Sequence, residues 1–175
     1  MSKLKYRFKS DEEEYMSEDA RKNYRIMNSL KLQLEWVKRQ LEYVSYQERY
    51  TPRLDLKVGE VYEFDFGVNV NCEFSNRHYG VVVANSYENN PLVIVCPLKS
   101  NRNGANPSSD INLGFIEGLI TDRETLAVVN QIRSLDKMRL YVNPIINEKT
   151  NESQTIKLNS KQIQLLKNGI KKVLI

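Results

Sequence analysis

The spacing of apolar residues changes at Pro52, and this change constrains the fold more than any other feature. Residues 17–50 contain neither Gly nor Pro, and their apolar side chains recur at alternating steps of three and four residues. This heptad spacing predicts a long amphipathic helix whose apolar stripe can form a coiled coil. Ser17 is placed to cap the helix and Pro52 to end it. The stripe consists of Met27, Leu30, Leu34, Val37, Leu41 and Val44.

Such a helix would be roughly 50 Å long. One small domain cannot cover an apolar stripe of that length. The length favours pairing with a second helix, from another copy of the chain or from a partner protein, over a clamp within one molecule. We therefore expect residues 1–52 to form an N-terminal helical extension.

After Pro52, apolar residues alternate with polar ones, as in strands with one buried face. The first such segment is LKVGEVYEFDFG (56–67). Short strands separated by turn-rich loops predict a mainly β unit, a small barrel or sandwich, over residues 53–175. Asn159 or Ser160 can cap a C-terminal helix that closes it. We expect further strands at 78–85, 91–97, 110–115 and 125–129, a mobile loop at 98–107, and a turn with a short helix at 131–141.

Composition excludes several classes of protein. The 175 residues allow one compact domain with an appendage, and the net charge of +4 is compatible with polyanionic partners without establishing one. No apolar run approaches the roughly 20 residues that cross a bilayer. Cys72 and Cys96 are the only cysteines and have neither metal-ligand spacing nor a disulfide framework. We expect a cytoplasmic protein without membrane association, metal or cofactor.

Four motifs occur in a fixed order between residues 58 and 140. They are VGEVYEFDFG (58–67), CEFSNRHYGVVVAN (72–85), VIVCPLKS (93–100) and TLAVVNQIRSLDKMRL (125–140). With this order and spacing, residues 57–141 resemble the PemK/MazF family of toxin endoribonucleases, and residues 1–52 fall outside the resemblance. The last motif carries the most specific match to the resemblance, a strand-like segment followed by the run QIRSLDKMRL.

The resemblance implies an SH3-like small β-barrel that forms a homodimer and binds single-stranded RNA across the subunit interface. It also implies an endoribonuclease toxin of a type II toxin–antitoxin system, neutralised by a cognate antitoxin protein. In this family the ribose 2′-OH attacks the adjacent phosphorus without a metal, which leaves a 2′,3′-cyclic phosphate and a 5′-OH. Such a reaction needs a base, cationic donors for the phosphorane and an acid for the leaving oxygen.

The chain departs from the family pattern at the first catalytic position. Counting from Glu73, the family's arginine falls on His78 and its following proline on Tyr79, while Arg77 lies one residue earlier. A one-residue slip of the loop would let Arg77 bind the phosphate. Without a slip, His78 replaces the arginine as acid or base, since its ordinary pKa of about 6.5 suits proton transfer. Structural roles for both, a strand cap for His78 and a solvated Arg77, also remain open.

The second departure lies in VIVCPLKS, where the family has a catalytic Ser or Thr directly after Pro-Leu. Lys99 occupies that position and Ser100 follows it. Because side chains alternate along a strand, Ser100 would face the other way unless the strand bends or ends. Lys99 could stabilise the transition state as a point charge, or be an ordinary solvated lysine.

Several other polar and aromatic residues are candidates for RNA binding. Arg102 is a plausible phosphate contact, and Tyr79 can stack on an unpaired base. Glu73 can orient Arg77 or accept a hydrogen bond from a base edge. Structural alternatives exist for each, including barrel packing for the aromatic side chains and an ion pair for Arg133. The full set is Glu73, Asn76, Tyr79, Arg102, Gln131 and Arg133.

The sequence thus predicts an endoribonuclease that cleaves single-stranded RNA. The substitutions at His78 and Lys99 leave one alternative open. The chain would then be a non-catalytic RNA- or DNA-binding or assembly protein built on the same barrel.

Overall fold

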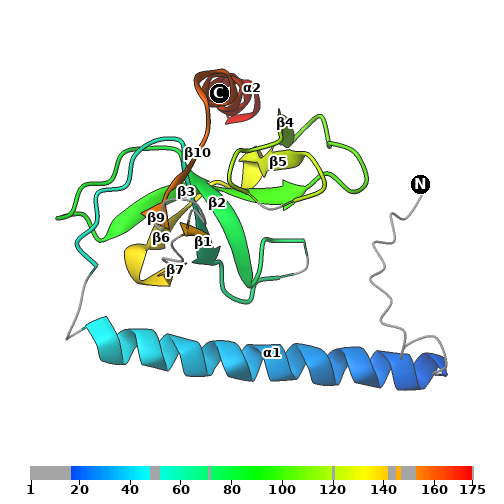
Figure 1. Ribbon diagram of the computed structural model, residues 1–175. Helices are drawn as coiled ribbons and strands as arrows, with labels where there is room; N and C mark the ends of the chain where they lie inside the picture. Colours follow the sequence, from blue (N-terminus) through cyan, green and yellow to red (C-terminus); the bar gives the residue numbers. More distant parts are fainter. Residues whose placement is uncertain are drawn as a thin grey trace. The chain divides into compact units, whose positions relative to one another are not determined.

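The protein is described from a computed structural model (Figure 1). It describes residues 17–47, 52–70, 72–119, 121–141, 145–146 and 153–174. The chain divides into two compact units between Glu42 and Tyr43. A division between residues 52 and 53, as expected from the change in periodicity, stays a prediction.

The long N-terminal helix is present as α1, Glu18–Gln47. The Ser17 hydroxyl accepts a hydrogen bond from the Ala20 amide (3.3 Å), which confirms the predicted cap. Glu18 and Asp19 add negative charge to the first turn, where the helix dipole favours it. All six residues of the apolar stripe are exposed to solvent. Coiled-coil pairing therefore stays a prediction.

The second unit is built on an eight-stranded antiparallel sheet with the order β10-β1-β2-β3-β5-β4, in which β6 pairs with β3 and β7 with β1. β8 and β9 form a separate pair. The strands are β1 Glu60–Asp65, β2 Arg77–Val82, β3 Leu92–Ser100, β4 Asp110–Gly114, β5 Thr125–Val128, β6 Arg133–Asp136, β7 Leu140–Tyr141, β8 Ile145–Ile146, β9 Ser153–Gln154 and β10 Ile156–Lys157.

β3 pairs with different strands along its length. Its first half pairs with β6, from Leu92 to Val95, and its last three residues pair with β5. Residues 98–100, expected to begin a loop, thus continue the strand because β5 supplies their hydrogen-bond partners. Residues 131–141, expected as a turn and a short helix, contain strand β6 as well as the 3₁₀-helices η2 (Val129–Gln131) and η3 (Lys137–Arg139).

Side-chain alternation divides the core into two clusters. Val61, Val81 and Cys96 point into one cluster, where Leu166 of the C-terminal helix α2 (Ser160–Leu174) joins them. The other cluster consists of Leu56, Phe64, Phe66, Val82, Val93, Val95 and Leu135.

A capping box fixes the start of α2. Asn159 Oδ1 accepts from the Gln162 amide and Gln162 Oε1 accepts from the Asn159 amide, both at 2.9 Å. Gln162 Nε2 then donates to the carbonyl oxygens of Leu113 and Phe115, which ties the helix to the end of β4. The predicted fold, mainly β with a long N-terminal and a C-terminal helix, is confirmed. Among the described residues, no helix has the length and apolar character that crossing a bilayer requires.

Candidate functional site

The pairing of β2 with β3 brings two of the candidate residues to one face. Gly80 is paired with Pro97, and the two side-chain positions share a face of the sheet. His78 lies two residues before Gly80, and Lys99 lies two residues after Pro97. Because side chains alternate along a strand, His78 and Lys99 project from that same face. Arg77 and Ser100, one residue away from each, project from the other.

β2 pairs regularly with β1 from its first residue, Arg77, directly after the loop. Its pairs with β1 run without interruption from Asp65–Arg77 to Val61–Val81. An inserted residue would leave a bulge in this ladder, and the pairing contains none. Within the described strands, this ladder fixes the face from which each β2 side chain projects. That His78 matches the family's arginine stays a prediction.

Arg77 is held on the opposite face. Its Nη2 lies 2.6 Å from Glu63 Oε2, and its guanidinium stacks 4.0 Å from the centre of the Tyr141 ring. Such an exposed ion pair stabilises a fold by at most about 1 kcal/mol. Its effect here is to orient Arg77 away from His78 and Lys99.

His78 lies against the loop that precedes β2. Its ring meets the Phe74 ring edge-on, with 5.1 Å between the centroids. The residue is accessible to solvent, but partial desolvation of the imidazole lowers its pKa, against the opposing effect of the Glu63 charge. His78 is accordingly neutral at pH 7, the form that accepts a proton.

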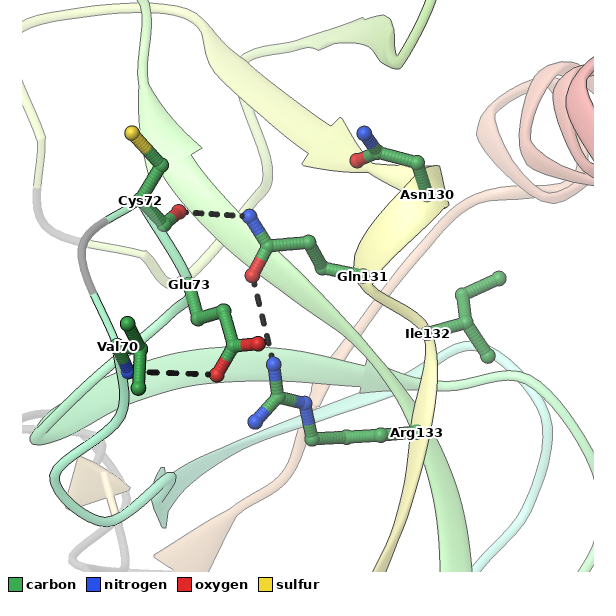
Figure 2. A pocket seen from close by; sticks show the side chains of 7 residues that line it. All are labelled: Val70, Cys72, Glu73, Asn130, Gln131, Ile132 and Arg133. Atoms are coloured by element: carbon green, nitrogen blue, oxygen red, sulfur yellow. Dashed lines mark hydrogen bonds between the residues drawn. The ribbon is translucent and has the colours of Figure 1, made fainter.

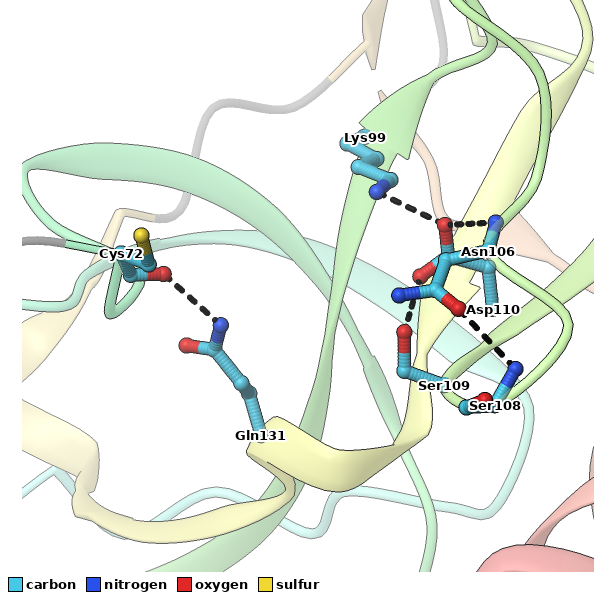
Figure 3. A network of polar contacts seen from close by, with 7 residues as sticks. All are labelled: Cys72, Lys99, Asn106, Ser108, Ser109, Asp110 and Gln131. Atoms are coloured by element: carbon cyan, nitrogen blue, oxygen red, sulfur yellow. Dashed lines mark hydrogen bonds and ion pairs between the residues drawn. The ribbon is translucent and has the colours of Figure 1, made fainter. Parts of the chain in front are cut away.

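Lys99 is anchored by a buried carboxylate (Figure 3). Its Nζ lies 2.8 Å from Asp110 Oδ2, and the Asp110 side chain is 1% exposed. The Asn106 amide and the Ser109 hydroxyl also donate to Asp110. Burial by itself raises the pKa of Asp110, but these hydrogen bonds and the Lys99 charge bring it below its ordinary value. Asp110 therefore stays ionised and holds the Lys99 ammonium by an ion pair.

Gln131 holds the loop that precedes β2, and Figure 2 shows its side chain hydrogen-bonded to Cys72. Its Oε1 accepts from the Phe74 amide (2.6 Å), and its Nε2 donates to the Cys72 carbonyl (3.0 Å). Arg133 Nη2 donates to the same Oε1 at 3.4 Å, and its guanidinium lies 5.8 Å from the Phe66 ring centre. One amide thus fixes both the loop and Arg133. A pocket of about 570 Å³ lies here, lined by Val70, Cys72, Glu73, Asn130, Gln131, Ile132 and Arg133.

The structure gives the remaining candidates other positions or roles than a place beside His78 and Lys99. Asn76 has a φ of 64°, and its backbone exchanges hydrogen bonds with Phe66 and Gly67, so it shapes the turn into β2. Tyr79 projects from the same face as Arg77. Arg102 follows the end of β3, where its amide donates to the Ser100 carbonyl (3.0 Å).

Glu73, although it lines the pocket, does not orient Arg77. Its Oε2 lies 3.4 Å from the Val70 amide, while Glu63 holds Arg77. Sequence reasoning missed Glu63 and Asp110 as partners of the candidate cations. The alternation of apolar and polar residues predicted the strand that contains Glu63. It did not predict that this strand pairs with β2, which is what brings Glu63 to Arg77.

Two residues of the QIRSLDKMRL motif are structural. Asp136 accepts from the Met138 amide (2.8 Å) and caps η3. Lys137 is 1% exposed, and its Nζ donates to the carbonyl oxygens of Leu54 (2.6 Å) and Tyr87 (2.7 Å). Desolvation lowers the pKa of Lys137. Among the residues that the structure describes, no cluster of His, Cys, Asp and Glu side chains is arranged to hold a metal ion.

Comparison with known proteins identifies the family of the chain. The model of one protein family, described as "PemK-like, MazF-like toxin of type II toxin-antitoxin system", matches residues 57–174, well over half of the chain. The chain belongs to the PemK/MazF toxin family. No curated protein sequence matches it. Residues 1–56, which include all of α1, lie outside the matched segment.

Solved structures of toxins are similar in part. MazF (form I) from Deinococcus radiodurans has 16% identity and a TM-score of 0.48, over 71% of this chain and 97% of that one. The Mycobacterium tuberculosis toxin MazF-mt6 has 10% identity and a TM-score of 0.44, over 66% and 95%. A mycobacterial endoribonuclease in complex with its cognate antitoxin has 14% identity and a TM-score of 0.42, over 68% and 93%.

Proposed function

We propose that this PemK/MazF toxin is a metal-independent endoribonuclease for single-stranded RNA. The observation that carries the proposal is the shared face of His78 and Lys99. Counted from Glu73 and from the Pro97-Leu98 pair, these residues fall where the family pattern has its catalytic Arg and its Ser or Thr. They pair a neutral imidazole with a fixed ammonium, which are the two groups that the cleavage of RNA by its own 2′-OH needs.

In the proposed reaction, the His78 imidazole takes the proton of the ribose 2′-OH. The 2′-oxygen forms a bond to the adjacent phosphorus, and the bond from phosphorus to the 5′-oxygen breaks. The Lys99 ammonium carries the negative charge of the phosphorane and gives the leaving 5′-oxygen its proton. The products are a 2′,3′-cyclic phosphate and a 5′-OH.

The neighbouring residues have positioning roles in this proposal. Asp110 holds the Lys99 ammonium in place by an ion pair of 2.8 Å. Gln131 holds the loop whose Phe74 packs on His78, and Arg133 adds a positive charge beside the pocket. Arg77 and Ser100 take no part in the chemistry, because they project from the other face.

The partners follow from family membership. We propose that the protein acts in the cytoplasm as a homodimer and that a cognate antitoxin protein inhibits it by covering the RNA site. Support comes from the family description as toxins of toxin–antitoxin systems and from the neighbour that is described as an endoribonuclease with its antitoxin.

A cleavage assay on the purified full chain tests the proposal. Mixed-sequence RNA is incubated with the protein in excess EDTA, with a MazF enzyme of known activity as the positive control. We expect fragments with 2′,3′-cyclic phosphate and 5′-OH ends. RNA that stays intact while the control cuts it would contradict the proposal.

The replaced catalytic residues favour one second candidate. With Lys99 tied to Asp110, the barrel could bind RNA without cutting it. RNA binding by filter retention, together with intact RNA in the cleavage assay, would establish that function. Cleavage that is lost in a His78→Ala variant would exclude it.

A further inference from the structure

The exposed apolar stripe of α1 has no role in the proposed RNA cleavage. Its six side chains, Met27 to Val44, are each between 50% and 71% exposed. They cover about 26 Å of helix at 1.5 Å per residue. A continuous stripe of this kind marks a surface that pairs with another helix.

The charges beside the stripe indicate what kind of helix can pair with it. Taking Met27, Leu34 and Leu41 as heptad a positions places Lys31 and Lys38 at e, all exposed. The opposite flank, at g, carries Ile26, Gln33 and Gln40. Neither flank carries a carboxylate from residue 26 to residue 40.

A second copy of this helix offers the two lysines no acidic partner in either orientation. In a parallel pair, e meets g of the partner helix, so each lysine faces an uncharged Ile or Gln. In an antiparallel pair, e meets e, which brings Lys31 of one copy near Lys38 of the other. The combination of β-branched a positions with Leu at d, which favours parallel two-stranded coiled coils, is also absent: the a positions are Met27, Leu34 and Leu41, and the d positions are Leu30, Val37 and Val44.

We propose that this stripe is a docking surface for an acidic amphipathic helix of another protein. The partner helix presents Leu-type residues to the stripe and Glu or Asp beside them, where they pair with Lys31 and Lys38. This interaction is separate from the RNA site and does not depend on RNA cleavage. It gives the segment outside the family match a binding role of its own.

Two designed three-heptad peptides test the proposal by fluorescence anisotropy with the full chain. Both have Leu at a and d; one has Glu at every e and g position, and the other has Lys. We expect the Glu peptide to bind at least about tenfold more tightly than the Lys peptide at low salt, with the difference shrinking as salt rises. A Lys31→Glu/Lys38→Glu variant should reverse the preference. A Leu34→Asn variant should weaken binding of both peptides.

Sedimentation separates this partner from a second copy. The Leu34→Asn variant should have the same mass in solution as the wild type, because the stripe is not the contact between copies. A loss of mass in that variant would overturn the proposal in favour of self-pairing. Equal binding of the two peptides, or none of the Glu peptide, would overturn it as well.

Discussion

Replacing Lys137 by Met should destabilise the second unit although it leaves the proposed catalytic residues untouched. Met has a similar length and volume, so the variant removes the ammonium with little change in packing. The Leu54 carbonyl then loses its bond from Nζ, which costs about 1–2 kcal/mol because this acceptor is only partly buried. The Tyr87 carbonyl still accepts from the Asn90 amide, so its loss costs less, about 0.5–1 kcal/mol.

Against these losses, the variant no longer buries a desolvated charge. We therefore expect a net fall of about 2 kcal/mol in the free energy of unfolding. With a urea m-value of about 2 kcal/mol/M, the midpoint should fall by about 1 M. Urea denaturation followed by far-UV circular dichroism measures this shift.

Lys157→Met is the matched control. Lys157 also forms an ion pair, with Glu60 at 3.1 Å, but its side chain is 58% exposed. Its loss should cost less than about 1 kcal/mol. If the two variants had equal midpoints, the reasoning that Lys137 is a buried structural tether would be refuted.

Three further predictions concern the loop, the C-terminal helix and the proposed base. Gln131→Ala should speed hydrogen exchange at the Phe74 amide by about tenfold, whereas Gln131→Glu, which keeps the acceptor, should not. Gly169→Ala should destabilise the protein by about 1–2 kcal/mol in thermal unfolding, since a Cβ there collides with the Ile111 side chain. In an Ile111→Ala background the same change should stabilise it by up to about 1 kcal/mol, because Ala favours the helix; destabilisation there would contradict the collision. Because desolvation lowers the pKa of His78 below 6.5, kcat/KM for RNA should fall as the base becomes protonated, with a midpoint below pH 6.5; a midpoint above pH 7 would contradict that role.

The elements with local signals could be predicted from the sequence. Ser17 and Asn159 were predicted as helix caps from their residue types and positions alone. The alternation of apolar and polar residues around Phe64 predicted β1. The four ordered motifs identified the barrel, because each has its own strand or turn.

The elements that depend on distant partners could not be predicted. β6 is four residues long and exists because it pairs with the first half of β3. The polar end of β3, including Lys99, is a strand only because β5 lies beside it. β5 pairs with both β3 and β4, and this pairing brings Asp110 close to Lys99. Neither segment alone could therefore predict the ion pair.

The choice between Arg77 and His78 illustrates the same limit. The sequence placed both at the start of a strand, but a loop of uncertain length left the register open. The uninterrupted pairing of β1 with β2 fixes which of them shares a face with Lys99. The catalytic role of His78 stays a proposal.

The central claim is that His78 does the chemistry and Arg77 does not. Single-turnover cleavage of one RNA in EDTA by the wild type, His78→Ala and Arg77→Ala measures this directly, with circular dichroism to verify that each variant is folded. The account predicts that His78→Ala lowers the rate by about 100-fold or more, while Arg77→Ala stays within a few-fold of the wild type. A folded Arg77→Ala variant that has lost cleavage, beside an active His78→Ala variant, would contradict it.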